Sequence, residues 1–244
     1  MGWKQSKLDL VTKGSRMFLF RGPLTIIVFE IIRRSEMTMA PKPATKFQTL
    51  LLKFSQADAK EDRKKIETAL WNEFGTEYAV FVLDMSGFSM LTRKYGIVHY
   101  LSMVKRMQLT SEPIIKSYSG KMLKYEADNC FAVFPDALSA VNAAIAMQHA
   151  FTAENILTSD DQDIHIAVGI DYGKLLIIGN EDCFGDPVNR ASKMGEDVAA
   201  AGEILITKEA LESIPTEAGI KTREISISIS GISIPAYAVD YRGE

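Results

Sequence analysis

Apolar runs and helically spaced apolar positions alternate along the chain from residue 78 onward. Residues 78–83 (YAVFVL) form a continuous apolar run, which is typical of a strand buried on both faces. Residues 89–118 place apolar side chains at helical spacing, as at Leu101, Val104 and Met107. The same criteria predict a hairpin over 121–125 and 130–134, a helix over 137–151, strands over 164–170 and 174–178, a helix over 187–200, a strand over 203–207, a short helix over 208–213, and closing strands over 220–228 and 236–240.

The order of these elements indicates the fold. Strand, helix, hairpin, helix and strand follow one another, which is the order of a split βαβ, ferredoxin-like unit. We therefore expect an α+β domain in which helices cover one face of the sheet and the other face is open for function. Many activities share this fold, so the fold alone does not identify one.

Residues 45–76 form a helical segment before the first strand. Apolar positions keep a spacing of three to four residues through Phe47 and Leu50, and again before Leu70. Gly75 is expected to end the second helix. Two roles fit such a helix pair: dimerisation or signal relay, and simple packing on the domain that follows.

Residues 1–44 are the least conventional part of the chain. Charges, a glycine and a proline interrupt the apolar stretch within residues 17–34, and its longest uncharged run, 22–29, is shorter than the roughly 20 residues that span a bilayer. Two interpretations stand: weak contact of residues 17–34 with a membrane surface, or an extension outside the folded unit, with Met37 or Met39 as the natural start. The expected divisions of the chain are residues 1–44, 45–76 and 77–244.

Composition narrows the classes of function without identifying one. Of the 244 residues, 47% are hydrophobic and 24% are charged, which is ordinary for a soluble globular protein. The 28 basic and 31 acidic residues give a net charge of −3, which argues against nucleic acid as a partner. Cys130 and Cys183 are too few for a disulfide framework and suit a reducing compartment. We therefore expect a cytoplasmic protein, peripheral to the membrane if its N-terminal segment binds lipid.

Two acidic residues lie at the ends of predicted strands. Asp84 follows the run 78–83, and Asp128 lies in the tight connection of the hairpin. The first strand and the hairpin are neighbours in a ferredoxin-like sheet, so the two carboxylates can meet and hold Mg²⁺ with positions open for phosphate oxygens. The alternative is an ordinary helix N-cap at Asp84 and a turn residue at Asp128. Backbone N–H groups at a helix N-terminus would bind phosphate, and the candidates for this are Ser86, Gly87, Phe88 and Ser89.

Three motifs show which family the chain resembles. Residues 81–89 (FVLDMSGFS) resemble the opening motif of class III nucleotidyl cyclases, the adenylate and guanylate cyclases. Residues 120–128 (GKMLKYEAD) are similar to their second motif, in which a lysine precedes the second metal aspartate by four residues. Residues 182–194 (DCFGDPVNRASKM) resemble the third motif, and 202–207 the strand that follows it. The resemblance covers about residues 78–241, with all motifs in order.

The resemblance implies a reaction and a set of roles. The 3′-hydroxyl of a nucleoside triphosphate attacks its own α-phosphorus, which gives a 3′,5′-cyclic nucleotide and pyrophosphate. Asp84, Asp128 and the backbone carbonyl of Met85 would hold two divalent ions per site, Mg²⁺ or Mn²⁺. Lys124 and Asp182 would read the base. A lysine donor and an aspartate acceptor suit adenine, so the resemblance favours ATP and an adenylate cyclase.

The resemblance also implies a dimer. The metal aspartates of the family come from one chain and the base-reading and asparagine groups from the other, so a symmetric homodimer would hold two complete sites. Asn189 corresponds to the asparagine that orients the ribose, and Lys193 stands where the family has a catalytic arginine. Lysine keeps the charge of arginine but loses its planar fork. Arg190 lies on another face of the helix and is not expected to replace that arginine.

The chain departs from the family at two further places. Residues 228–231 (SISG) lack the lysine often found near the C-terminal strands, and Ala127 replaces a frequent glycine. Loss of one good transition-state contact typically costs on the order of 10²–10³ in rate, and lysine is a partial replacement for arginine, so we expect a working but slow cyclase. The alternatives are a guanylate or pyrimidine cyclase, and a catalytically inactive nucleotide-binding dimerisation module.

Overall fold

A computed structural model describes residues 42–229 and 232–242 of the chain. From Pro43 onward the chain belongs to one compact unit. The predicted membrane contact of residues 17–34 and nearly all of the predicted extension over 1–44 lie outside the described residues. Within the described part of the chain, no helix is both long and apolar enough to cross a membrane.

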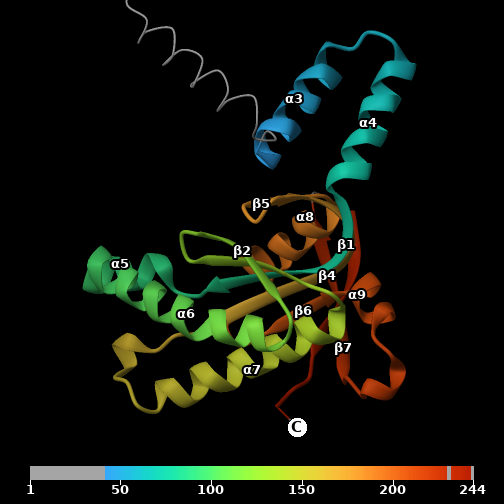
Figure 1. Cartoon of the computed structure of the whole chain (residues 1–244). Helices are drawn as coiled ribbons and strands as arrows, with labels where there is room; N and C mark the ends of the chain where they lie inside the picture. Colours follow the sequence, from blue (N-terminus) through green and yellow to red (C-terminus); the bar gives the residue numbers. More distant parts are fainter. Residues whose placement is uncertain (1–41, 230–231, 243–244) are drawn as a thin grey trace, which may run out of the picture. The chain divides into compact units, whose positions relative to one another are not determined.

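Strand β1 (Gly75–Met85) is an inner strand of the sheet, with a neighbour on each side (Figure 1). It pairs antiparallel with β3 (Asn129–Phe134) on one side and with β4 (Ile166–Ile178) on the other. Strand β2 (Lys121–Glu126) pairs with β3, which gives the order β2-β3-β1-β4. This arrangement confirms the predicted ferredoxin-like α+β fold, in which the first strand and the hairpin are neighbours.

The sheet continues beyond β4 with further strands. β6 (Ile204–Thr207) lies parallel to β4, and β8 (Ile232–Val239) and β7 (Thr222–Ile229) follow as an antiparallel pair. β5 (Asp182–Phe184) pairs with the last residues of β4, outside this path. The sequence pattern predicts β6, β7 and β8 but not β5, because three residues are too few to show a hydrophobic period.

Strand β4 differs from the prediction. The sequence predicts two strands separated at residues 171–173, whereas β4 is one strand of 13 residues. It continues because β1 is longer than its apolar run and begins at Gly75, which pairs with Leu176. The pairing of Ala79 with Tyr172 carries the ladder through the predicted break. Pairing with a neighbouring strand thus overrides the local polar signal.

Two long helices cover one face of the sheet (Figure 1). α6 (Ile97–Ser117) and α7 (Ala137–Asn155) pack there against odd-numbered side chains of β1, such as Phe81 and Leu83. The alanines of α7 that face the sheet are fully buried, which lets the helix approach closely. The short helix α9 (Lys208–Ser213) contributes to the same core. The remaining single turns are η1 (Asp160–Gln162) and η3 (Thr216–Ala218).

The predicted helical region 89–118 consists of two helices. α5 (Phe88–Tyr95) ends at Gly96, and α6 begins directly after it. Gly96 has a φ of 87°, a left-handed conformation that favours glycine, which explains the break.

A helical segment also crosses the opposite face of the sheet. α8 (Asp186–Ser192) runs into a π-helical turn, η2 (Lys193–Val198), and both pack on β4 and β1. This close approach needs glycine, since a Cβ on Gly169 of β4 would lie 2.1 Å from the carbonyl oxygen of Ala191. The expectation that helices cover only one face of the sheet therefore holds for the long helices α6 and α7. The other face is only partly open, because α8 and η2 pack on it.

The N-terminal helical segment packs on the sheet. α3 (Pro43–Gln56) and α4 (Lys60–Phe74) enclose a small apolar cluster with Ile178 of β4. Phe47 of α3 also stacks on Phe184 of β5, with ring centroids 5.8 Å apart. α4 ends where the sequence predicts, one residue before the glycine. Of the two roles considered for this segment, these contacts support packing on the following domain.

Candidate active site

Asp84 lies one residue before the end of β1. Side chains alternate along a strand, so Asp84 shares the face of Val80 and Val82, on which α8 also packs. Its side chain is partly buried. The backbone N–H of Ser86 donates a hydrogen bond to the carbonyl oxygen of His165 at 2.9 Å, which holds the chain where it leaves the sheet.

The predicted phosphate loop leads directly into α5, which begins at Phe88. Gly87 precedes the helix with a φ of 99°, so the conformational freedom of glycine is needed here. Gly87 and Ser89 are exposed, and Ser86 is partly buried. The first N–H groups of a helix have no partner within the helix, which suits them to an anion. The phosphate-binding role of this loop stays a prediction.

Asp128 occupies the turn of the β2–β3 hairpin. Beside it, Ala127 has a φ of 53°, a left-handed conformation that costs a residue other than glycine roughly 1 kcal/mol. This is a physical reason for the glycine that is frequent at this position of the motif. The Oδ2 atom of Asp128 accepts a hydrogen bond from the hydroxyl of Tyr100 at 2.7 Å, so α6 contributes to the site through a buried side chain.

The two carboxylates affect each other. Burial, and to a lesser degree the negative charges of Asp128 and Glu196, raise the pKa of Asp84 to about 6. Asp84 and Asp128 are thus within electrostatic range of each other, as the strand order predicts. Among the described residues, no three His, Cys, Asp or Glu side chains are arranged to hold a metal ion together. Two carboxylates and the Met85 carbonyl are hard oxygen donors, which fit Mg²⁺ or Mn²⁺ and leave coordination positions for phosphate oxygens.

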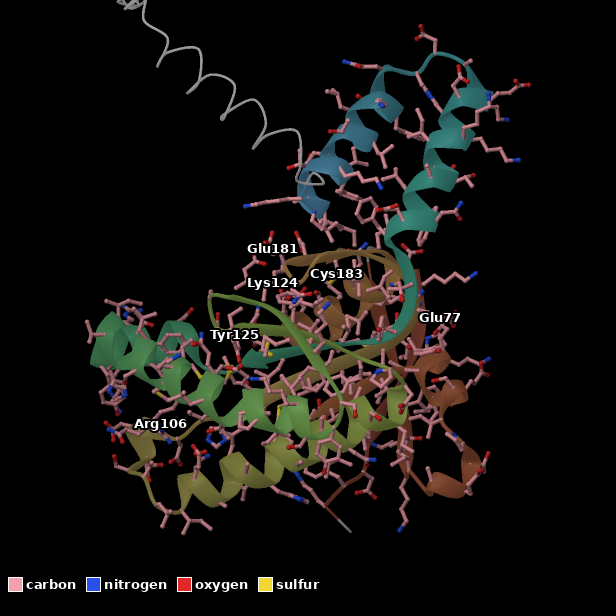
Figure 2. All side chains as sticks on the ribbon, in the orientation of Figure 1. Glu77, Arg106, Lys124, Tyr125, Glu181 and Cys183 are labelled. Carbon is pink, nitrogen blue, oxygen red and sulfur yellow. The ribbon has the colours of Figure 1, made fainter. Side chains whose placement is uncertain are left out.

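A second charged group joins β2 to β5. The Nζ atom of Lys124 lies 3.2 Å from the carboxylate of Asp182 and 3.0 Å from that of Glu126. Figure 2 labels Lys124 on β2, together with Glu181 and Cys183, the residues that flank Asp182 in the sequence. Asp182 also accepts a hydrogen bond from the backbone N–H of Cys183 at 2.9 Å, which orients its carboxylate. The fold therefore brings together the two side chains that are predicted to read the base.

Cys183 is not part of this polar group. Its side chain is buried in an apolar cluster on the second face of the sheet, together with Val80 and Leu175. Burial raises the pKa of Cys183 to about 11 and also raises the pKa of Cys130, so both thiols stay protonated at neutral pH. Cys183 therefore offers no group to the base, although it directly follows Asp182.

Asn189 and Lys193 lie on the segment formed by α8 and η2. Asn189 is exposed, and Lys193 is 41% exposed and ion-paired with Asp197 in the next turn. Within the described ranges, neither side chain makes a hydrogen bond or ion pair with Asp84 or Lys124. The structure thus groups Asp84 with Asp128 and Lys124 with Asp182. The η2 segment also lies within electrostatic range of Asp84, because the charge of Asp197, the partner of Lys193, contributes to raising the pKa of Asp84. The predicted contacts of Asn189 and Lys193 with ribose and phosphate stay predictions.

A buried ion pair anchors α8 to the sheet. The Nε atom of Arg190 lies 2.5 Å from Oδ2 of Asp171, whose side chain is fully buried in β4. The other carboxylate oxygen of Asp171 accepts hydrogen bonds from the Thr207 hydroxyl at 2.5 Å and from the backbone N–H of Tyr172 at 2.7 Å. The guanidinium group of Arg190 is therefore held by Asp171 in the sheet, which agrees with the prediction that Arg190 does not replace the missing arginine.

Three residues around the site escape the sequence pattern. In the sequence, Tyr100 fits the apolar spacing of a helix like any other core residue. No feature of the sequence indicates that its hydroxyl contacts the candidate site. Asp171 falls at the predicted strand break, where an acidic residue directly after an apolar run was the available signal. Asp197 stands four residues after Lys193, a spacing at which opposite charges pair on a helix, so this contact could have been predicted.

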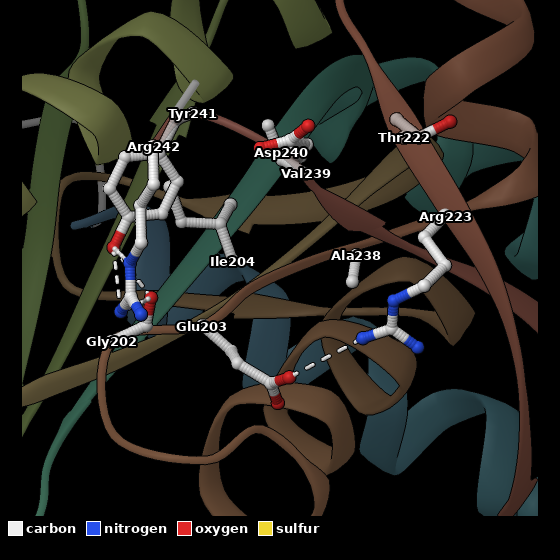
Figure 3. Close-up of a pocket in the computed structure, with 10 residues that line it drawn as sticks. All are labelled: Gly202, Glu203, Ile204, Thr222, Arg223, Ala238, Val239, Asp240, Tyr241 and Arg242. Atoms are coloured by element: carbon white, nitrogen blue, oxygen red, sulfur yellow. Dashed lines mark hydrogen bonds and ion pairs between the residues drawn. The ribbon is translucent and has the colours of Figure 1, made fainter. Parts of the chain in front are cut away.

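A separate cavity of about 310 Å³ lies at the end of the sheet where β6 and β7 begin and β8 ends (Figure 3). Its walls include Glu203 and Arg223, whose charged groups are 3.9 Å apart. Another wall is Tyr241, whose hydroxyl donates to the carbonyl oxygen of Gly202 at 2.6 Å. None of the predicted site residues lines this cavity, so it is not the candidate active site.

Comparison with known proteins identifies the family. Residues 76–238 match the family described as the adenylate and guanylate cyclase catalytic domain. The chain therefore belongs to the class III nucleotidyl cyclases, and the predicted membership is confirmed. Members of this family bind a nucleoside triphosphate, function as dimers and generally use Mg²⁺ or Mn²⁺.

Individual relatives agree with this assignment. A protein named "Putative adenylate cyclase 3" from Rhizobium meliloti (strain 1021) is 29% identical over 129 residues, which are 53% of this chain and 22% of that protein. The crystal structure of the guanylyl cyclase Cya2 has a TM-score of 0.61 at 18% identity and covers 68% of this chain and 92% of its own. The adenylyl cyclase CyaB from P. aeruginosa has a TM-score of 0.57 at 24% identity and covers 69% and 96%. These structural likenesses establish the fold alone.

The raised pKa of Asp84 leads to a prediction about stability. A carboxyl group whose pKa is higher in the folded protein than in the unfolded chain destabilises the fold once it ionises, so stability falls as the pH rises from about 4 to about 6. Asp84→Asn removes this charge. We expect it to raise the free energy of unfolding of the metal-free protein by on the order of 1 kcal/mol at pH 7.5, after allowance for solvent screening.

The measurement is urea unfolding in the presence of a chelator between pH 4 and pH 8. The gain should shrink as the pH falls below 6, because Asp84 is then protonated in the folded protein. Asp240→Asn, which removes the same charge from an exposed side chain, should show no such pH-dependent gain. A gain for Asp84→Asn that is equal at pH 4.5 and pH 7.5 would contradict the argument.

Proposed function

We propose that the chain is an adenylate cyclase that converts ATP to 3′,5′-cyclic AMP and pyrophosphate, with residues 77–244 as the catalytic domain. The type of reaction follows from the family, and the choice of ATP rests on the Lys124–Asp182 pair. The ammonium group is a donor, the carboxylate is an acceptor, and the two lie 3.2 Å apart. Adenine presents an acceptor at N1 beside a donor at its exocyclic amine, which complements this pair, whereas guanine presents the opposite order.

In the proposed reaction, O3′ of the ribose attacks the α-phosphorus of the same nucleotide. The O3′–Pα bond forms while the bond from Pα to the β-phosphate oxygen breaks, pyrophosphate leaves, and the hydroxyl proton passes to solvent. Divalent ions held by Asp84, Asp128 and the Met85 carbonyl would supply charge neutralisation for the triphosphate and the ionising hydroxyl. The contribution of the chain itself is positioning: the N–H groups of residues 86–89 bind phosphate, and Asn189 orients the ribose.

The proposed enzyme is a homodimer. The carboxylates Asp84 and Asp128 form one group and Lys124 and Asp182 another. In the described part of one chain, no hydrogen bond or ion pair links the two groups. Symmetric association of two chains would place the carboxylates of one chain opposite the base-reading pair of its partner, giving two equivalent sites. The general use of dimers in this family supports the arrangement.

A second candidate function is nucleotide binding without turnover. The observation that favours it is Lys193, which replaces an arginine of the family and is engaged by Asp197. The retained carboxylates Asp84 and Asp128 favour the enzyme instead, because binding of the base alone does not need them.

The direct test is a product assay with ATP, GTP, CTP and UTP in the presence of Mg²⁺ or Mn²⁺. We expect cyclic AMP as the main product. Asp84→Asn should lower its formation by at least about 10²-fold, whereas Asp240→Asn should leave it unchanged. The absence of any cyclic product from a dimer verified by light scattering would exclude the enzyme and leave the binding module. A higher kcat/KM for GTP than for ATP would overturn the choice of base.

The base-reading pair is tested by a double substitution. Lys124→Glu combined with Asp182→Cys reverses the donor and acceptor order, since the glutamate accepts where the lysine donates. Asp182→Cys accompanies Lys124→Glu because a glutamate at position 124 would otherwise face the carboxylate of Asp182 as well as that of Glu126. We expect kcat/KM for ATP to fall by about 10²-fold and the GTP to ATP ratio to rise by at least about tenfold, because mispaired polar groups in a binding site are costly. Lys121→Glu, the same lysine-to-glutamate substitution at an exposed position of β2, is the control. An unchanged ratio would refute the assigned role.

The replacement of arginine by lysine leads to a graded prediction. Lys193→Arg restores the bidentate fork and should raise kcat, by up to about tenfold, with little change in KM. Lys193→Ala should lower kcat by about 10²-fold, because the charge is lost altogether. Steady-state kinetics with ATP distinguish the three forms. Equal kcat values for lysine and alanine at this position would show that Lys193 takes no part in the reaction.

A further inference from the structure

The hydroxyl of Tyr100 lies between the two segments that carry the candidate metal ligands. It donates a hydrogen bond to Oδ2 of Asp128 at 2.7 Å and lies 3.5 Å from the carbonyl oxygen of Met85. The first atom belongs to the hairpin turn and the second to the end of β1. One side chain of α6 thus touches both segments.

The position of Tyr100 on α6 does not by itself call for a hydroxyl. The side chain is 2% exposed and shares the core face of α6 with Met103, Val104 and Met107. A phenylalanine would fill the same apolar space, whereas a buried tyrosine needs a partner for its O–H. Packing alone therefore does not account for the hydroxyl, whereas its hydrogen bond to Asp128 does.

The chemistry of this contact is that of a donor beside a paired carboxylate. The phenol hydroxyl of a tyrosine is a donor at neutral pH and a carboxylate only accepts, so Tyr100 donates and Asp128 accepts. A hydrogen bond to one carboxylate oxygen fixes the orientation of the group and spreads its negative charge.

We propose that Tyr100 is a positioning residue of the metal site, which holds Asp128 and the backbone at Met85 in the arrangement that binds divalent ions. This inference rests on the proposed function, because it takes Asp128 and Met85 as the ligands. Partners in the second coordination sphere of this kind typically change metal affinity by about 10–100-fold.

The experiment measures Mn²⁺ binding by the full chain in the presence of 3′-deoxy-ATP, which lacks the attacking hydroxyl and cannot react. Free Mn²⁺ is followed by electron paramagnetic resonance. Tyr100→Phe should weaken Mn²⁺ binding by at least about tenfold. The matched control is Tyr125→Phe, which removes a phenol hydroxyl that donates to the carbonyl of Gln108 on the same helix at 3.4 Å (Figure 2). This control should bind Mn²⁺ within about twofold of the unaltered protein.

Asp128→Asn separates the inference from the proposed function. It should weaken Mn²⁺ binding, and adding Tyr100→Phe to it should weaken binding no further, because Tyr100 acts through Asp128. If Asp128→Asn leaves Mn²⁺ binding unchanged, the metal site of the proposed function is wrong. If Asp128→Asn weakens binding and Tyr100→Phe does not, the inference about Tyr100 alone is overturned.

A conservative variant covers the case in which Tyr100→Phe fails to fold, as judged by thermal unfolding. Incorporation of 4-aminophenylalanine at position 100 keeps a donor at the end of the ring. We expect this protein to fold and to bind Mn²⁺ within about threefold of the unaltered protein. A folded 4-aminophenylalanine protein with Mn²⁺ binding at least tenfold weaker would overturn the positioning role.

Discussion

The pairing of β1 with β3 and β4 is the constraint on which the rest of the structure depends. β1 is buried on both faces, with odd-numbered side chains in the core beneath α6 and α7, and with Val80 and Val82 in the cluster on the other face. A shift of one residue in register would exchange these two sets. The same register places Leu83 opposite Cys130, so that Asp84 lies beside the turn that carries Asp128. The core and the candidate metal ligands are thus positioned by one strand.

The second face is organised by charge as well as by apolar contact. Asp171 lies in the middle of β4 and is satisfied by Arg190, Thr207 and a backbone N–H group. Such a buried pair is weak evidence for stability, because replacing both partners by apolar groups is often neutral, whereas breaking it leaves an unpaired buried charge. Its contribution is therefore geometric. It attaches to β4 the residue directly after Asn189, at the point where α8 crosses the sheet.

Hydrophobic pattern predicts most of the fold, and motif spacing predicts which polar residues matter. The run 78–83 corresponds to β1, because a strand buried on both faces is continuously apolar. The spacing around Val104 corresponds to α6, because a helix buried on one face repeats its apolar residues every three to four positions. The two predicted strands around Asp171 are one strand, since β1 supplies hydrogen-bond partners across the polar residues. Contacts between side chains on different elements, such as Tyr100 with Asp128, carry no local signal. Pairings of this kind depend on register and helix placement, which emerge only from the packed structure.

The ion pair of Lys193 with Asp197 bears on whether the departure from arginine ends catalysis. Both side chains are about half exposed, and an exposed pair four residues apart on a helix contributes only about 0.3–0.5 kcal/mol. A bound triphosphate, with its higher charge, can therefore draw the lysine away from Asp197 at small expense. The lysine then supplies a point charge without the planar fork of arginine. Since Asp84 and Asp128 are retained, the proposed site has a weakened phosphate contact rather than a missing one, which is the state expected of a slow enzyme.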